Sequence, residues 1–169
     1  MRHWRRAAAA VVLLPVAALV LTACLPPPPP PVTVSCGDAG TAGQSVAVCH
    51  LSYTAYMIDP NPFAQQVADS IASSGATCAN LAARHTPGST LLAVYAGATS
   101  VGENLYCQTS GPGTCPSNAQ GATNAVNAWL ASPPHRANMD GFAGAWVVGG
   151  AACNPATGYY FAVAQFHRP

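Results

Sequence analysis

The sequence predicts an α+β fold, on the evidence of two helical patterns and one pair of strands. Segments 61–75 and 118–130 repeat apolar residues at helical spacing. The runs AWVVGGAA and YYFAVAQF near the C-terminus are rich in valine and aromatic residues and flank the turn-forming CNPATG, which is typical of two strands joined by a tight loop. We therefore expect helices flanking a small antiparallel sheet.

The N-terminal segment, residues 1–23, has the order of a secretory signal peptide. Three arginines precede an apolar run at 7–21, and LTAC follows. The run of about 15 residues is short of the roughly 20 that a membrane-spanning helix needs. LTAC has the form of a bacterial lipobox, which predicts lipidation of Cys24. The alternative is an ordinary signal peptide that is cut near Ala23 and releases a secreted protein.

Residues 24–44 are interpreted as the lipidated cysteine and a spacer, and residues 45–169 as one domain. Six consecutive prolines follow Leu25, and such a run favours a stiff polyproline II segment of roughly 20 Å. A diacylglyceryl group on Cys24 would supply two acyl chains, which is enough for stable anchoring. The sequence thus predicts a domain held at the outer face of the cell membrane, with the membrane as its partner.

The charge balance excludes a nucleic-acid partner. Without the signal peptide, three arginines remain against five acidic residues, a formal net charge of −2, and the chain has no lysine. A nucleic-acid binder needs a basic patch to neutralise phosphates.

Six cysteines remain once Cys24 is set aside, and an even number in an exported chain predicts three disulfides. They are Cys36, Cys49, Cys78, Cys107, Cys115 and Cys153. Six cysteines allow 15 connectivities, and the local pair Cys107–Cys115 is the one we favour. No two of them have the short spacing of a zinc cluster, so they are interpreted as structural.

The elements of the first half are expected as follows. Residues 32–43 form an irregular lead-in tied down by Cys36, and 45–57 could be helical. The helix within 61–75 has Asn61 as its cap, a proline in its first turn and Gly75 at its end.

In the second half, 79–85 is expected to be a short helical piece, and TPGST a turn. Residues 91–102 show no clean period. The helix at 118–130 cannot continue through Pro133 and Pro134, so we expect a rigid turn there.

Three polar residues are candidates for a functional site. Glu103, in VGENLY, is the only glutamate in the chain, and His135 follows two prolines that restrict its backbone. His85 lies in RHTPGS. The competing interpretations are a solvated or capping carboxylate and surface-turn histidines. No HExxH, GxSxG or phosphate-binding motif is present. If the three residues meet, two imidazoles and a carboxylate would suit a zinc-like divalent metal, with His85 and His135 as ligands.

The motifs VGENLY and WLASPPHRAN, followed by GFAGAWVVGGAA and YYFAVAQF, resemble the CAP superfamily of cysteine-rich secretory, antigen 5 and pathogenesis-related 1 proteins, in the form of a bacterial lipoprotein. The resemblance covers roughly residues 45–166. It implies an α-β-α sandwich with a cleft lined by two histidines and acidic residues. His85, Glu103 and His135 match the cavity residues, whereas Ser132 stands where many members have a second glutamate.

The anchoring signals, together with a cleft that has no nucleophile, favour a binding module at the cell surface, with a lipid, a cell-wall component or a protein as its ligand. The alternative is a metal-dependent hydrolase that uses His85, His135 and Glu103, with Glu103 as the base. A third possibility is a purely structural surface protein. The oligomeric state is left open by the sequence.

Overall fold

The computed structural model describes residues 31–169, which form one compact unit. The predicted signal peptide, Cys24 and most of the proline run lie outside the described residues. No helix within residues 31–169 has the length and apolar character needed to cross a membrane.

The centre of the unit is a four-stranded sheet. Its strands are β1 (Met57–Ile58), β2 (Ser100–Thr109), β3 (Trp146–Asn154) and β4 (Tyr159–Arg168), in the order β1-β3-β4-β2. β4 is antiparallel to both of its neighbours, whereas β1 is parallel to β3. The two predicted strands near the C-terminus are confirmed as β3 and β4. The sheet is mixed because β1 adds a short parallel pairing to the expected antiparallel part.

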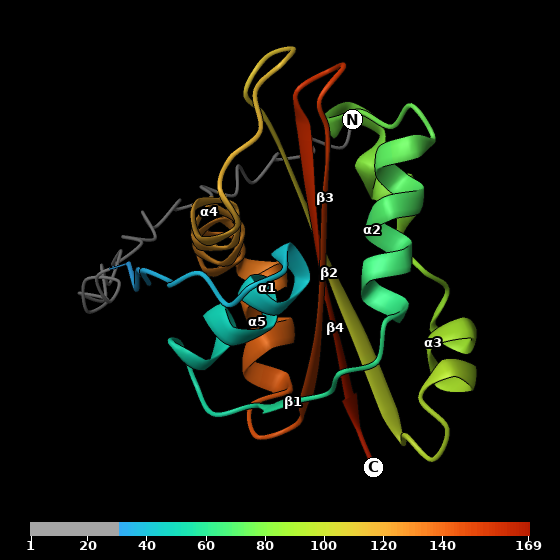
Figure 1. The fold of residues 1–169 in the computed structure, drawn as a ribbon. Coiled ribbons are helices and arrows are strands. Elements are labelled where there is room, and N and C mark those ends of the chain that lie inside the picture. Colours follow the sequence, from blue (N-terminus) through green and yellow to red (C-terminus); the bar gives the residue numbers. More distant parts are fainter. Residues whose placement is uncertain (1–30) are drawn as a thin grey trace, which may run out of the picture. The chain divides into compact units, whose positions relative to one another are not determined.

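Helices cover both faces of this sheet (Figure 1). On one face lie α1 (Ala42–Leu51), α4 (Asn118–Ala131) and α5 (Pro133–Gly141), and on the other lie α2 (Phe63–Ser73), the 3₁₀ helix η1 (Cys78–Arg84) and α3 (Gly88–Val94). The α+β class and the α-β-α layering are therefore confirmed.

The two faces of β4 supply two separate cores. Ala162, Ala164 and Phe166 pack with α1, α4 and α5, whereas Phe161 and Val163 pack with α2 and α3. Both sets are at most 1% exposed. This follows from the alternation of side chains along a strand, and it explains why β4 reads as an almost continuous apolar run.

The ends of the first helices follow from capping residues. α1 begins at Ala42, three residues before the predicted segment, because Thr41 and Gln44 form a capping box. It ends at Leu51, so the expected helical extension to residue 57 is wrong. At α2, the cap position is Pro62, one residue after the predicted Asn61. The Oδ1 atom of Asn61 still accepts the N–H of Phe63, at 2.9 Å.

Two expectations for the second half are wrong. The helix α3 begins at Gly88, within the TPGST segment that was expected to be a turn. Residues 100–109, for which no element was predicted, form the strand β2. Pro133 and Pro134 start the helix α5, where a rigid turn was expected. Proline suits the first turn of a helix, because N–H groups there have no intrahelical acceptor. α4 nevertheless ends at Ala131, as the prolines predict.

Three disulfides join the six predicted cysteines: Cys36–Cys49, Cys78–Cys107 and Cys115–Cys153. The favoured local pair Cys107–Cys115 is therefore wrong. Cys107 lies on β2, in the apolar layer that faces α2 and α3. It is bonded to Cys78 of η1, which is 29 residues away in the sequence, and not to the nearby Cys115.

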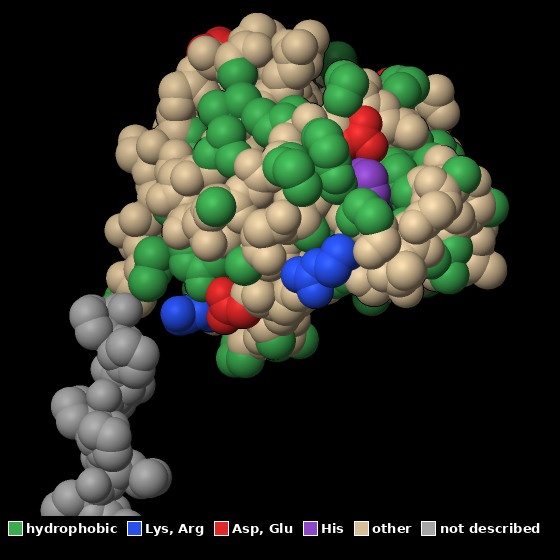
Figure 2. All heavy atoms as spheres, turned by 90° about the horizontal axis from the view of Figure 1, so that it is seen from below, with side chains coloured by type: hydrophobic (Ala, Val, Ile, Leu, Met, Phe, Trp, Pro, Cys, Tyr) green, Lys and Arg blue, Asp and Glu red, His purple; other side chains and the backbone are tan. Residues whose placement is uncertain are grey.

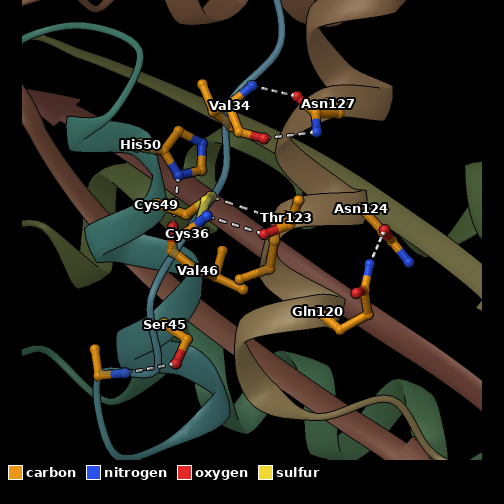
Figure 3. Close-up of a disulfide and its surroundings, with 12 residues drawn as sticks. Val34, Cys36, Ser45, Val46, Cys49, His50, Gln120, Thr123, Asn124 and Asn127 are labelled. Atoms are coloured by element: carbon orange, nitrogen blue, oxygen red, sulfur yellow. Dashed lines mark hydrogen bonds between the residues drawn. A yellow bond between two sulfur atoms is a disulfide. The ribbon is translucent and has the colours of Figure 1, made fainter.

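The lead-in, residues 31–40, has no regular secondary structure and is fixed against α4 (Figure 3). Asn127 accepts the N–H of Val34 at 2.8 Å and donates to its carbonyl at 2.9 Å. Thr123 accepts the N–H of Cys36 at 3.1 Å. Together with the Cys36–Cys49 disulfide, these contacts confirm that Cys36 ties the lead-in down.

Candidate functional site

Glu103 is positioned by β2, the edge strand of the sheet next to β4. Its side chain is only 3% exposed. The Oε1 atom accepts the main-chain N–H of Thr86 at 2.8 Å and lies 3.1 Å from Nδ1 of His85. The Oε2 atom accepts the side-chain amide of Gln165 at 2.8 Å. Both oxygens of the buried carboxylate accept hydrogen bonds, and these bonds offset the free-energy cost of removing the carboxylate from water.

Gln165 is a site residue that the sequence analysis did not find. It lies directly opposite Glu103 in the β2–β4 register and is completely buried. Its Oε1 atom accepts the hydroxyl of Tyr95 at 2.6 Å. The available signal was a single amide side chain within the apolar run YYFAVAQF, since buried polar residues in strands require partners.

His85 follows η1 and carries the exposed part of the site. Its side chain is 43% exposed, and Glu103 holds its Nδ1 atom. The main chain of the next residue, Thr86, donates to the same carboxylate oxygen. Glu103 therefore fixes both the loop and the ring, so the expected pairing of His85 with Glu103 is present.

His135 lies in the first turn of α5, and its Nδ1 atom is 2.8 Å from Oγ of Ser132. Its carbonyl accepts the side chain of Asn104 at 3.1 Å, and Asn104 in turn accepts the side chain of Asn138 at 2.9 Å. The asparagine of the GEN sequence thus joins β2 to α5, in the same way that its glutamate joins β2 to the His85 loop.

The two candidate histidines lie close enough to interact electrostatically. Burial lowers the pKa of His135, and the nearby charge of His85 lowers it further. The edge of β2 therefore brings all three predicted residues into one region, although Glu103 contacts His85 and not His135. Ser132 is the residue whose side chain orients the ring of His135.

The donor atoms fit a divalent metal only in part. Within residues 31–169, no group of three or more His, Cys, Asp or Glu side chains is arranged to hold a metal ion. Each candidate histidine has Nδ1 engaged, by Glu103 or by Ser132, which leaves Nε2 as the ligand atom. This is the usual arrangement of a metal-binding imidazole. Two imidazoles would leave at least two positions of a tetrahedral ion to other ligands.

The other two described histidines lie apart from this site. His167 is 2.8 Å from Oδ2 of Asp59 and stacks on the ring of Tyr95, with 4.4 Å between centroids. His50 is buried in the core on the α1 side. A surface hollow of about 400 Å³ lies between the N-terminal ends of α1 and α2, and its lining includes none of the three candidate residues.

The surface carries little charge. Residues 31–169 contain three arginines and five acidic residues. On the face drawn in Figure 2, the basic side chains form no continuous area.

No protein-family model matches this sequence, and no curated protein matches it. Among solved structures, an extracellular protein containing an SCP domain from Bacillus anthracis str. Ames is similar, with 18% sequence identity and a TM-score of 0.42. The match covers 76% of the present chain and 40% of the other. The present chain therefore matches less than half the length of that protein.

Proposed function

We propose that this chain is a CAP superfamily (SCP) domain, exported and anchored by a lipid on Cys24, that acts as a binding module at the outer face of the cell membrane. The observation that carries this proposal is the convergence at β2. The two motifs of the resemblance, VGENLY and SPPHRAN, meet there through Asn104, and His85 joins them through Glu103.

Binding is favoured over catalysis because of how Glu103 is used. Both of its oxygens are occupied, by donors from Thr86, His85 and Gln165. A general base must reach a substrate proton or a water molecule, whereas this carboxylate holds a loop and a ring in place. The six cysteines of the described residues are all in disulfides, so none of them is a thiolate nucleophile.

A metal-dependent hydrolase is the second candidate. It is favoured by one observation: each of the two imidazoles is held through its Nδ1 atom, which leaves its Nε2 atom available. His85 and His135 would hold the ion, and a bound zinc would activate water there. The exposed ring of His85 would leave room for additional ligands.

The two candidates are separated by hydrolysis and metal titration on the intact exported protein. We expect no turnover of casein or p-nitrophenyl acetate above that of Glu103→Gln, with or without added zinc. Asp140→Asn, which changes an exposed carboxylate on α5, is the matched control. Turnover that is lost in Glu103→Gln and kept in Asp140→Asn would refute the binding proposal. Stoichiometric zinc binding that is lost in His135→Ala but kept in His167→Ala would support the metal site.

The anchor is tested separately from the cleft. Cys24→Ala should abolish lipid attachment, detected by mass spectrometry, and move the protein from the membrane fraction to the soluble exported fraction. Cleavage near Ala23 without lipid would leave the native protein in the soluble fraction. That outcome would replace the anchored protein with a secreted one and leave the binding proposal intact.

A further inference from the structure

The two edges of the sheet differ in how many of their outward main-chain groups are hydrogen-bonded. At the β3 edge, beyond the short β1, the side chain of Gln65 takes the place of a strand partner for Ala151. It accepts the N–H of Ala151 at 3.1 Å and donates to its carbonyl at 2.8 Å. An unpaired edge is a site for pairing with another chain, and natural proteins usually cover it. This edge is closed at that point.

The β2 edge has free main-chain groups at a defined set of residues. The N–H of Ser110 donates to the carbonyl of Gly158 on the β4 side at 2.9 Å. Because bonding alternates along an antiparallel pair, the even-numbered residues of β2 face β4 and the odd-numbered residues face outward. The indole of Trp129 confirms this, since it donates to the outward carbonyl of Leu105 at 2.9 Å.

One open part of this edge lies at Val101 and Glu103, beside the candidate histidines. Asn104 and Leu105 are buried, at 1% and 5% exposure, and α5 and α4 cover the edge at these two residues. The strand becomes exposed again at its far end, at Thr109. Val101, Gly102 and Glu103 are all half-buried. Because the Glu103 side chain is only 3% exposed, the remaining exposed area of this residue belongs to its main chain. Within residues 31–169, no hydrogen bond is formed by the outward N–H or carbonyl of Val101 or Glu103.

The free groups lie between the two candidate histidines. The Glu103 side chain points to the α2 and α3 face and contacts His85, whereas the Asn104 side chain points to the opposite face and contacts the main chain of His135. The two histidines also interact electrostatically with each other. A ligand on this edge would therefore have one histidine on each side of it.

We propose that the site binds a short, extended peptide segment that adds to the sheet as a strand beside Val101 and Glu103. This rests on the proposed binding function and names its ligand class. Successive outward residues are about 6.8 Å apart along a strand, and each presents one donor and one acceptor. An extended peptide backbone has the same repeat and the same alternation, which an acyl chain does not have. Side chains of the bound strand would point alternately toward His85 and His135.

The experiment selects linear random heptapeptides on the immobilised intact exported protein and then methylates the backbone nitrogens of an enriched peptide one at a time. Strand pairing predicts a loss of affinity of tenfold or more at alternate positions and little loss between them. Hydrogen exchange of the Val101 and Glu103 amides should slow at least tenfold when the peptide binds.

Matched proline variants test the same point from the protein side. Val101→Pro removes an outward N–H in the open stretch without breaking the β4 ladder, and should weaken binding at least tenfold. Thr109→Pro removes an outward N–H at the far end of the same strand and should bind as the native protein does. Proline is tolerated at such positions of edge strands. Both variants are first checked by NMR for the amide chemical-shift dispersion of the folded protein. If either variant is not folded, the methylation scan alone tests whether the peptide pairs with the edge.

The proposal is overturned if no peptide is enriched, if methylation has no alternating effect, or if the two proline variants bind equally well. It is also overturned if the Val101 and Glu103 amides are already protected in a dimer of the free protein, because the edge would then pair with a second copy. The variants His85→Ala and His135→Ala distinguish failure of the peptide proposal from failure of the histidine cleft proposed above. If the alternating pattern survives both substitutions at native affinity, the edge binds peptide while the histidine cleft proposed above has no role.

Discussion

His50 is a titratable side chain at the centre of an apolar core. It is completely buried, with its ring 5.4 to 5.8 Å from those of Tyr56, Trp129 and Phe166. Its Nδ1 atom bonds to the carbonyl of Val46, whereas Nε2 has no partner in the described structure. Burial lowers the pKa of His50 to about 4, and the bond to Val46 offsets this only in part.

This residue predicts acid sensitivity. Between pH 6.5 and 4, the unfolded chain binds a proton at His50 that the native protein excludes. The free energy of unfolding should therefore be highest above pH 6.5 and fall by about 3 kcal/mol as the pH approaches 4. Denaturant unfolding at pH 7.5 and pH 4.5 measures this fall. His50→Leu should make the fall smaller, and an equal fall in both proteins would contradict the assignment.

At the level of residues, the sequence predicted that His85, Glu103 and His135 lie in one region, but it did not predict the hydrogen bonds that hold them there. His85 and Glu103 are in contact as expected, although only the motif of Glu103 carried the resemblance. Gln165 was missed, since pattern reasoning treats a single amide in an apolar strand as noise. The roles of Asn104 and Ser132 depend on β2 and α5 meeting in space, and no spacing along the chain reveals that meeting.

At the level of elements, consecutive glycines in β3 allow helices to pack closely on both faces of one strand. A Cβ atom on Gly149 would lie 2.2 Å from the carbonyl oxygen of Gly43 in α1. One on Gly150 would lie 2.0 Å from the carbonyl oxygen of Ala64 in α2. Since both obstacles are backbone, neither can move without shifting a helix.

Gly150→Ala should therefore destabilise the protein by about 3 kcal/mol, at the upper end of typical overpacking costs. Gly88→Ala is the matched control, because a Cβ there meets nothing within 4 Å and the position begins α3. It should leave the free energy of unfolding unchanged or slightly higher. Urea denaturation of the two variants provides the comparison, and similar losses in both would mean that the helices are free to retreat from β3.

Elements with a clear period were predicted well, and those without one were not. The apolar residues of α4 repeat at helical spacing, and its bounds differ from the prediction by a single residue. β2 was missed because SVGENLYCQT alternates neither cleanly apolar nor cleanly polar. Its side chains divide between a core and a polar site. α5 was missed because two prolines end one helix and begin the next, and the sequence signal for both events is the same.

At the level of the whole molecule, three disulfides hold the layers together. Cys78–Cys107 joins η1 to the sheet, and Cys115–Cys153 joins the β2–α4 loop to β3. The sequence predicted the number of bridges but not their pairing. Proximity along the chain favoured Cys107–Cys115, whereas the fold places each of these cysteines beside a distant one.

Reduction should therefore unfold the protein at physiological temperature. Loss of one native disulfide from a small secreted domain typically costs about 2 to 5 kcal/mol, and the total stability of a domain is only about 5 to 15 kcal/mol. Thermal melting followed by circular dichroism, with and without a phosphine reductant, checks this. An identical melting temperature in both conditions would show that the bridges are dispensable.

The lead-in also decides how the domain responds to mechanical load. A force that pulls on the chain ahead of Pro31 acts first on Val34, whose main-chain N–H and carbonyl are both hydrogen-bonded to Asn127. It acts next on Cys36, where the disulfide transmits the force to Cys49 of α1. The intervening residues 37–48 are bypassed, so a pull from the N-terminal side cannot peel them from the fold while that bond is intact.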